Sequence, residues 1–316
     1  MNPAVLSRAH PSLALIKYWG KKDARRNLPA TPSLAVTLAG AWTETRLEEA
    51  GVDAVSVDGV EQPPERYAAF FEAARRQLGC RLRFQARSAN SFPTAAGLAS
   101  SSSGFAALAA GCARLAGRVL APDALSALAR VGSASAARSV FGGFTLLPAG
   151  AQAARQLFPE DHWPQLRVLI AVVTGEAKPC SSREAMEATR RSSPYYRCWL
   201  RDSRGLLPAA QRALKRRDLQ ALGELMRLSY SRMHAALLAS SPPVSYWLPA
   251  TLALIRECEA LRKSGLGAWE TIDAGPQVKV LCLEADAPAV EARLRVLAAR
   301  TILCRPGPAP QVSQEG

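Results

Sequence analysis

Lysines gather near the start of this chain, where three of only seven lie within six residues. Lys17 follows the apolar run 14–16, and Lys21 and Lys22 come shortly after it. A single lysine at the end of a strand usually extends into solvent, whereas a cluster of ammonium groups in a lysine-poor chain favours anion binding. We therefore expect this segment to bind an anionic ligand, with a solvated lysine as the alternative.

A second segment of chemical interest is the run of small residues from Pro93 to Gly104, which contains four consecutive serines. Small side chains let backbone N–H groups approach a ligand, and a helix that begins directly afterwards adds the positive end of its dipole. Serine hydroxyls can also contact phosphate oxygens and Mg²⁺. The segment is not a Walker A loop, because no Gly-Lys-Ser/Thr ends it. We expect a polyphosphate cradle rather than a tightly packed helix start, since serines propagate helices poorly.

Two further segments place charged side chains beside turns. Asp273 ends an apolar segment directly before the turn residues 274–276. Such a carboxylate often only caps the turn, but opposite a lysine and a phosphate it becomes a candidate base or charge partner. Ser133 and Ser135 stand at the start of a predicted helix, with Arg138 one turn inside it. A plain N-cap and a surface arginine are the alternatives there.

Hydrophobic patterns indicate the elements that must position these side chains. Residues 33–48 alternate with a period near two, and 53–59 continue the pattern across the turn 49–51, which predicts a hairpin. The continuous apolar run 166–174 is typical of a strand buried on both faces. Further strands are predicted at 81–89, 267–273, 278–284 and 300–304. Helices are predicted at 64–79, from the serine run to near Gly117, from Pro122, at 132–141, across 181–264 with breaks near Pro194, Pro208 and 242–243, and from Pro288.

Because strands and helices are mixed rather than strictly alternating, we predict an α+β fold in two lobes. The first predicted lobe, 1–175, is α+β and carries the phosphate-binding loop. The second, 176–316, is a helix-rich α+β lobe that ends in a loose tail after Arg305. A chain of 316 residues with 48% hydrophobic composition can bury cores of this size.

The amino-acid composition limits which binding partners and which cellular location we expect for this protein. The net charge of +14 invites a nucleic-acid function, but 33 of the 40 basic residues are arginines spread along the chain, so we expect no nucleic-acid partner. No apolar run approaches the roughly 20 residues that a membrane span needs, and Arg8 and His10 interrupt any signal peptide. The seven cysteines contain no C-x-x-C pair, which predicts reduced thiols and a cytoplasmic location rather than a zinc site or disulfides.

Taken together, these segments resemble the GHMP kinase superfamily and, within it, the diphosphomevalonate decarboxylase family. The matching segments occur in family order between residue 9 and about residue 284. They are 14–23, 28–29 with 33–38, 92–101, 132–138, 181–183 with Met186, 233–235 and 271–276. The serine-rich loop marks only the superfamily, whereas the Lys-Tyr-Trp-Gly-Lys and Asp-Ala-Gly-Pro segments are specific to the decarboxylase branch.

The resemblance implies a two-lobed GHMP-kinase-like fold, usually a homodimer, with ATP, Mg²⁺ and a phosphorylated mevalonate substrate in the cleft between the lobes. The implied reaction is phosphorylation of the tertiary 3-hydroxyl of (R)-5-diphosphomevalonate, then loss of phosphate and CO₂ to leave isopentenyl diphosphate. This is a step of isoprenoid biosynthesis by the mevalonate pathway. A tertiary alcohol leaves poorly, so phosphorylation makes its departure feasible.

The resemblance also assigns roles to individual residues. Asp273 would act at the 3-hydroxyl as base or orienting group, Lys17 would stabilise phosphoryl charge, and Arg138 would clamp the substrate carboxylate or phosphate. The substrate would be bound by Tyr18, Lys21, Ser133, Ser135, Ser182 and Arg183, with Met186 as a wall of the pocket. The nucleotide and Mg²⁺ would be held by Pro93, Ala95, Ala96, Gly97, Leu98, Ala99, Ser100, Ser101, Ser102 and Ser103, with Ser100 and Ser101 as the metal contacts.

Several departures from the family pattern leave alternatives open. They are Ser12-Leu13 for Asn-Ile, Thr31 for Asn, Ala134 for Gly, Arg191-Ser192-Ser193 for Glu-Thr-Ser, and Gln277 for Asn. Ala134 restricts the backbone near the substrate phosphates, so the departures affect substrate identity before reaction type. A phosphomevalonate decarboxylase, or a kinase that stops at the 3-hydroxyl, is the alternative. A non-catalytic nucleotide- or nucleic-acid-binding protein is a remote one, supported only by the net charge.

Overall fold

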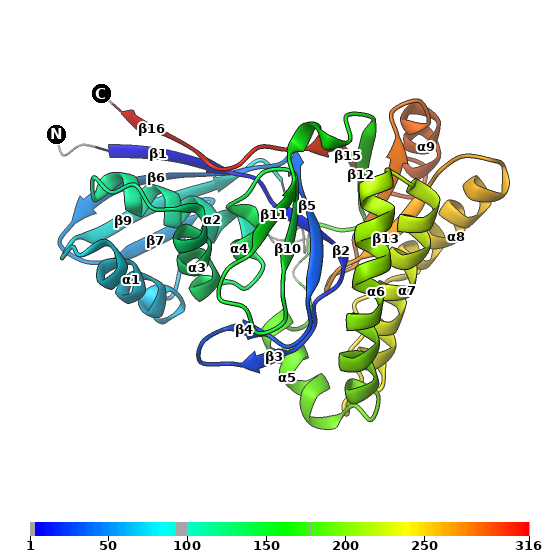
Figure 1. Cartoon of the computed structure of the whole chain (residues 1–316), viewed down its shortest axis with the longest axis horizontal. Coiled ribbons are helices and arrows are strands. Elements are labelled where there is room, and N and C mark those ends of the chain that lie inside the picture. The colour runs from blue at the N-terminus through cyan, green and yellow to red at the C-terminus, as the bar shows by residue number, and fades with distance from the viewer. Residues whose placement is uncertain (1–3, 93–99, 177, 316) are drawn as a thin grey trace.

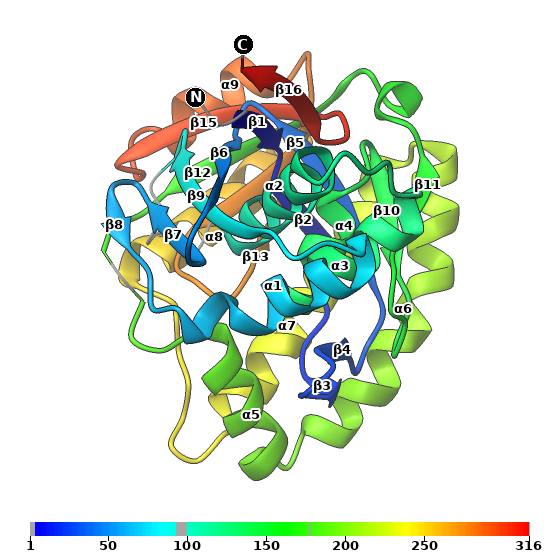
Figure 2. The same cartoon turned by 90° about the vertical axis from the view of Figure 1, so that its left-hand side faces the viewer.

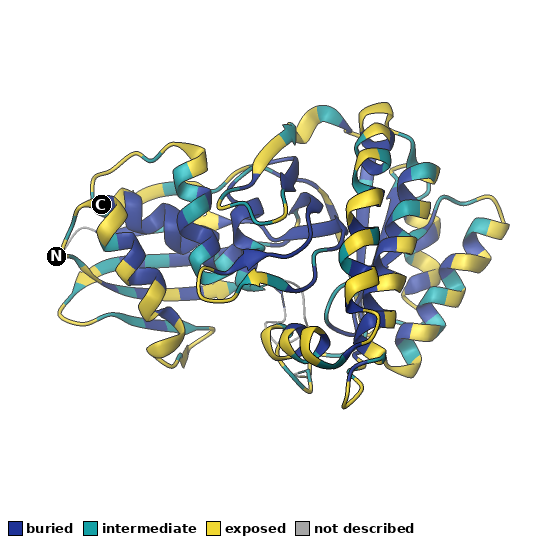
Figure 3. Ribbon diagram, turned by 60° about the horizontal axis from the view of Figure 1, so that its bottom comes forward, coloured by how far each residue is buried: buried dark blue, intermediate teal, exposed yellow. Residues whose placement is uncertain are grey.

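The computed structural model describes residues 4–92, 100–176 and 178–315 of the chain. Strands gather into two large sheets with helices against their faces, which is the predicted α+β class (Figure 1). Buried residues follow the strands and the inner sides of the helices, and exposed residues follow the outer sides (Figure 3).

The first sheet lies on the left of Figure 1. Its strands in order across the sheet are β16 (Gln311–Glu315), β1 (Ala4–Ala9), β6 (Thr43–Ala50), β9 (Arg83–Asn90), β7 (Ala54–Val57) and β8 (Val60–Glu61). Helix α2 (Ser100–Leu115) packs on β1, β6 and β9, and the helices α1 (Glu65–Leu78) and α3 (Pro122–Gly132) pack with α2 and with each other. Apolar side chains from the helices and strands share one buried cluster, which includes Phe71, Phe84 and Leu108.

The second sheet connects the first sheet to the helices on the right of Figure 1. Its strands in order are β11 (Arg155–Phe158), β10 (Phe144–Leu147), β5 (Ser33–Ala39), β15 (Arg300–Pro306), β12 (Leu166–Val172), β14 (Val278–Leu283) and β13 (Trp269–Ile272), and β2 (Ser12–Ile16) also pairs with β5. Along β12, Val168 and Ile170 join one core cluster while Leu169 and Ala171 join another. The prediction of a strand buried on both faces is confirmed.

Helices from the second half of the chain cover both faces of this sheet. They are α6 (Tyr196–Arg216), α7 (Leu219–Leu238), α8 (Pro249–Lys263) and α9 (Ala287–Leu294). The remaining elements are the small hairpin β3 (Lys21–Asp23) and β4 (Leu28–Pro29), the short helices α4 (Ala136–Ser139) and η1 (Glu160–His162), and α5 (Ser182–Ser192). Leu214 of α6 and Met226 of α7 pack in the same cluster as Val168, whereas Leu254 of α8 and Val290 of α9 pack with Leu169.

The predicted hairpin over residues 33–59 is wrong. The segment 33–48 divides at Gly40, so that β5 enters the second sheet and β6 the first. Strands β6 and β7 do not pair with each other, because β9 lies between them. Gly40 has φ 109°, and a Cβ there would lie 2.6 Å from the carbonyl oxygen of Leu303. The chain therefore turns at the one residue type that this backbone and this close approach permit.

The predicted break at Pro208 is also wrong, because Pro208 lies inside α6. Proline in a helix interior costs about 3 kcal/mol or more. Buried side chains on both sides of it, Leu206 and Ala210 among them, pack against the second sheet and offset that cost. The helical run breaks instead at Arg217, which has φ 57°, and Asp218 then caps α7.

The tail predicted to be loose forms strands. Residues 311–315 are β16, which pairs antiparallel with β1, and the two strands lie side by side in Figure 2. This pairing satisfies backbone groups along the free edge of β1. Glu315 adds an ion pair of 2.7 Å with Arg46 on β6. The lobe boundary between 175 and 176 stays a prediction, since the last strands return to both sheets.

Candidate active site

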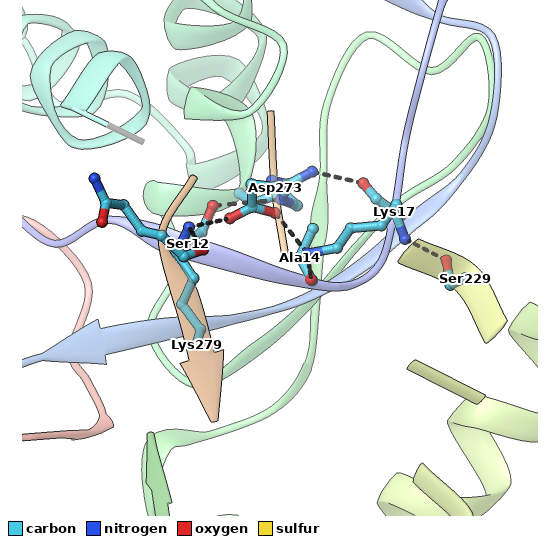
Figure 4. A network of polar contacts seen from close by, with 9 residues as sticks. Ser12, Ala14, Lys17, Ser229, Asp273 and Lys279 are labelled. Atoms are coloured by element: carbon cyan, nitrogen blue, oxygen red, sulfur yellow. Dashed lines mark hydrogen bonds and ion pairs between the residues drawn. The ribbon is translucent and has the colours of Figure 1, made fainter. Parts of the chain in front are cut away.

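The centre of the site is an ion pair between two segments that the sequence singled out. Lys17 follows β2 and Asp273 follows β13, and the Lys17 Nζ lies 2.6 Å from the Asp273 Oδ1 (Figure 4). The lysine side chain is 2% exposed and the aspartate side chain 24% exposed. Lys17 is therefore not the solvated lysine of the alternative interpretation, and Asp273 directs its carboxylate to a cation.

Lys17 is fixed from three sides. Its ammonium group donates to the carbonyl of Ala14 at 2.8 Å, and its backbone N–H donates to the Ser229 hydroxyl on α7 at 2.9 Å. A register shift between Ala14 and Ile16 in β2 precedes the lysine. Burial lowers the pKa of Lys17 to about 8, although the neighbouring Asp273 carboxylate opposes this change.

A second lysine completes the surroundings of Asp273. The Lys279 Nζ lies 3.3 Å from Oδ2, so that each carboxylate oxygen faces one lysine. Burial alone would raise the pKa of Asp273, but Lys17 and Lys279 together hold it well below its usual range. The sequence interpretation missed Lys279. The available signal was a lysine inside the apolar segment 278–283, where a buried cation needs a partner.

Arg138 on α4 lies buried beside this pair, with 3% exposure. Its guanidinium donates to the hydroxyls of Ser33 at 2.7 Å and Ser12 at 3.3 Å. Burial lowers its pKa to about 10, so it stays protonated at neutral pH. Both hydroxyl partners are neutral, which leaves the cation's charge available to an anion. The surface-arginine alternative is thereby excluded.

The Lys-Tyr-Trp-Gly segment is held by its tryptophan. The Trp19 backbone N–H donates to Thr31 Oγ1, and its indole donates to Thr189 Oγ1 on α5, both at 3.1 Å. Trp199 on α6 donates to the carbonyl of Trp19 at 3.1 Å. These contacts fix the turn that carries Lys17. Thr31, which departs from the family pattern, thus anchors the segment through its hydroxyl.

Serine hydroxyls link the predicted nucleotide and substrate regions. Ser101, in the first turn of α2, lies 3.3 Å from the Ser133 hydroxyl, which lies 2.9 Å from that of Ser135. The Ser12 hydroxyl donates to the carbonyl of Ser135 at 3.4 Å. The start of α2 and the loop before α4 are therefore contiguous, as a site for both ligands requires.

Two of the predicted diphosphate-binding residues, Lys21 and Tyr18, lie within the electrostatic influence of nearby arginines. Burial, assisted by the positive charge of Arg183, lowers the pKa of Lys21 to about 8. Burial raises the pKa of Tyr18, while Arg138 and Arg183 oppose that rise. Arg183 itself is exposed. These influences indicate that Lys21, Tyr18, Arg138 and Arg183 share one electropositive region.

Two predicted substrate-binding residues on α5, Ser182 and Met186, differ from each other in their surroundings. The Ser182 hydroxyl accepts a hydrogen bond of 2.9 Å from Lys178, which also donates to the carbonyl of Ala274 at 3.0 Å. Met186 is 7% exposed and packs with Trp19 and other apolar side chains, so its contact with a substrate stays a prediction. Lys178 was not predicted, because a single lysine in a polar loop has no distinguishing sequence pattern.

A cavity of about 300 Å³ opens beside the first turn of α2. Its lining includes Thr43, Asp58, Tyr67, Asn90, Ser100 and Ser101. The volume is at the lower end of the roughly 300–1,000 Å³ typical of ligand sites. Half-buried serine hydroxyls at the N-terminus of a sixteen-residue helix suit phosphate oxygens and Mg²⁺, so the residues present fit a Mg²⁺–nucleotide.

The other predicted nucleotide contacts are placed differently. Ser102 and Ser103 are fully buried; the Ser102 hydroxyl accepts from the Ser12 backbone N–H at 3.3 Å, and the Ser103 hydroxyl lies 2.6 Å from that of Thr43. Their side chains are engaged in packing α2, and a nucleotide contact for them stays a prediction. Pro93, Ala95, Ala96, Gly97, Leu98 and Ala99 lie outside the described residues.

Comparison with known families accounts for nearly the whole chain. Residues 9–157 match the diphosphomevalonate decarboxylase-like N-terminal domain, and residues 168–302 match the mevalonate 5-diphosphate decarboxylase C-terminal domain. The chain belongs to the diphosphomevalonate decarboxylase family. Both the resemblance seen in the sequence and the predicted GHMP-kinase-like fold are confirmed.

Individual relatives agree with the family assignment. Human diphosphomevalonate decarboxylase is 34% identical over 317 residues, covering 89% of this chain and 77% of the human protein. The mevalonate diphosphate decarboxylase of Enterococcus faecalis superimposes with a TM-score of 0.91 at 32% identity over 100% of both chains. A solved structure of MDDEF in complex with MVAPP, AMPPCP and magnesium has a TM-score of 0.92 at 33% identity over 100% of both chains.

Proposed function

We propose that this protein catalyses the ATP-dependent decarboxylation of (R)-5-diphosphomevalonate to isopentenyl diphosphate, with ADP, phosphate and CO₂ as the other products. The observation that carries the proposal is the ion pair of the buried Lys17 with the half-buried Asp273, beside the buried Arg138, within a chain of this family. The solved relative that binds MVAPP, the ATP analogue AMPPCP and magnesium supports the same substrate and cofactors.

Substrate binding uses the cations that surround the central pair. Arg138 holds the substrate carboxylate, because its fork of donors suits a planar anion. Lys21 and Arg183 bind the diphosphate, with Tyr18, Ser133, Ser135 and Ser182 as further contacts to phosphates and hydroxyls. This arrangement directs the 3-hydroxyl toward the carboxylate of Asp273.

Asp273 orients the 3-hydroxyl, and Lys17 stabilises negative charge that develops on the transferring phosphoryl group. A carboxylate held anionic by two lysines accepts a proton weakly, which favours an orienting role over that of a strong base. Release of the phosphorylated oxygen leaves an electron-deficient carbon, and the carboxylate departs as CO₂ to form the double bond.

The first turn of α2 would hold the nucleotide. Ser100 and Ser101 face the cavity beside the helix N-terminus and would contact the phosphates and Mg²⁺. Bound Mg²⁺–ATP supplies the phosphoryl group that converts the 3-hydroxyl into a leaving group.

We infer the assembly and location from the family resemblance and from the cysteines. The proposal includes a homodimer, two lobes that meet near residue 175, and a role in the lipid metabolism of the cytoplasm. All seven cysteines are free thiols, as a reducing compartment requires. No helix among the described residues is both long and apolar enough to span a membrane.

The test follows ADP and CO₂ together in the presence of ATP and Mg²⁺, with mevalonate, its 5-phosphate and its 5-diphosphate compared side by side. Equal amounts of both products, with the diphosphate preferred, are expected. Preference for the monophosphate would make the protein a phosphomevalonate decarboxylase. ADP without CO₂ would make it a 3-hydroxyl kinase, and neither product from any substrate would refute the proposal.

A further inference from the structure

Lys279 is a buried lysine that, in the reaction described above, only helps to keep Asp273 anionic. It lies in β14, hydrogen-bonded between β12 and β13, where its backbone is opposite Ile170 on one side and Thr271 on the other. Its side chain is 3% exposed. The neighbouring positions Val278 and Val280 pack in one core cluster and Leu281 in another, so the lysine occupies a strand position where apolar residues surround it.

A buried ammonium group is costly unless it has a compensating partner. The Nζ of Lys279 lies 3.3 Å from the Asp273 Oδ2 and 3.5 Å from the carbonyl oxygen of Gln277. Figure 4 shows the Asp273 carboxylate between Lys279 and Lys17. The chain therefore directs two buried lysines, from two different segments, at the two oxygens of one carboxylate.

We propose that Lys279 is a positioning residue for the decarboxylation reaction: it holds the second oxygen of Asp273, so that the carboxylate keeps one orientation while Lys17 acts on the phosphoryl group. The inference rests on the proposed function.

The geometry separates the tasks of the two lysines. Lys17 follows the end of a strand and carries a short contact of 2.6 Å, whereas Lys279 is fixed inside a strand of the second sheet. A cation that must respond to a substrate phosphate draws away from its carboxylate partner. With Lys279 on the other oxygen, Asp273 remains paired and cannot rotate freely about its terminal bond.

The second lysine also influences the first electrostatically. The charged and titratable groups that face Lys17 and Asp273 from the neighbouring elements are Lys279 on β14, Arg138 on α4, His234 on α7 and Lys178 before α5. Lys279 and Arg138 lower the pKa of Lys17, while Asp273 raises it. Removal of the charge at Lys279 therefore keeps Lys17 protonated to higher pH.

The test compares the full-length protein with Lys279→Met, Lys279→Gln and Lys279→Arg, and uses Lys263→Met on the exposed side of α8 as a control. Methionine matches the size of lysine without its charge, and glutamine keeps a polar group if the methionine variant fails to fold. The readouts are kcat, KM for the diphosphate substrate, and the pH dependence of kcat, where the bound diphosphate keeps Lys21 protonated.

Both neutral variants are expected to lose about 10- to 100-fold in kcat with a smaller change in KM, as for a misplaced catalytic group. In both variants the pH at which kcat falls on the alkaline side should rise by about half a pH unit or more, because a like charge near Lys17 is gone. In Lys279→Arg, kcat should fall at the same alkaline pH as in the wild-type protein, and most of the wild-type kcat should be retained. The role of Lys279 would be overturned by a neutral variant with wild-type kcat. It would also be overturned by a neutral variant that loses kcat while the pH at which kcat falls stays that of the wild-type protein. An inactive wild-type protein would instead refute the proposed function.

Discussion

The Nζ of Lys17 lies 2.6 Å from the Oδ1 of Asp273, although 256 residues separate the two in the chain. Their contact joins the end of β2 to the end of β13. It joins the two family domains at one charge pair, since Lys17 lies in the segment 9–157 and Asp273 in the segment 168–302. The pair therefore forms only when both parts of the chain are folded together.

The pH profile of the wild-type protein should show an alkaline limb. Burial lowers the pKa of both Lys17 and Lys21 to about 8, so each loses its positive charge as the pH rises through that value. Phosphoryl stabilisation and diphosphate binding both need the protonated amine. We expect kcat/KM to fall above about pH 8, measured with saturating ATP and Mg²⁺. A profile that stays flat to about pH 9.5, a unit or more past these values, would contradict the role of the lysines.

Substrate choice should depend on Lys21. Lys21→Met removes a charge from the diphosphate region, whereas the monophosphate presents one phosphate fewer to it. We expect KM for the diphosphate to rise about 10-fold or more, and KM for the monophosphate to rise less, since a charge-assisted hydrogen bond contributes about 1.5–3 kcal/mol. Lys22→Met, an exposed neighbour, is the control. Equal increases in both KM values would place Lys21 away from the distal phosphate.

The serines of α2 should divide into two functional types. Ser101→Ala removes a hydroxyl that lines the cavity, and we expect KM for Mg²⁺–ATP to rise several-fold with little loss of stability. Ser103→Ala removes a buried partner of Thr43, and should lower the free energy of unfolding by about 1 kcal/mol while changing that KM less than Ser101→Ala does. Steady-state kinetics and urea unfolding distinguish them. The reverse pattern would show that the nucleotide lies deeper along α2.

Gly20 should be required for the Lys17 turn. It has φ 92°, and a Cβ there would clash with the hydroxyl oxygen of Tyr196. We expect Gly20→Ala to lower the free energy of unfolding by about 1–3 kcal/mol and to reduce kcat, because Lys17 is displaced. Gly51→Ala, where the new methyl group meets nothing within 4 Å, is the matched control. Equal thermal midpoints for both variants would contradict this reading of the turn.

Local patterns predicted most elements but not their pairing. The apolar run 166–174 and the helical segment 64–79 correspond to β12 and α1, because periodicity and caps are local properties. The prediction of a hairpin over 33–59 was wrong, since the sequence pattern does not specify that β9 comes between β6 and β7. The prediction of a loose tail was wrong for the same reason, because β16 is stabilised by pairing with β1, which is distant in the sequence.

In the candidate site, too, local sequence patterns do not show which distant residues come into contact. Lys17, Arg138 and Asp273 were found through motifs whose spacing is distinctive, and the structure brings them together. Lys279 has no motif, and only its contact with Asp273 across a turn reveals that the buried cation has a partner. Ser229 likewise reaches Lys17 from 212 residues away, which no local pattern can indicate.

The central claim is that the Asp273 carboxylate serves the reaction and not the binding of nucleotide. The most direct measurement compares Asp273→Asn with the wild-type protein in the formation of ADP and CO₂ from ATP and the diphosphate, alongside the affinity for a fluorescent ATP analogue. Asp202→Asn on α6 is the control. We predict that both products fall by about 10³-fold or more while nucleotide affinity changes less than about 3-fold. A rate near that of the wild-type protein in a folded Asp273→Asn variant would contradict the account.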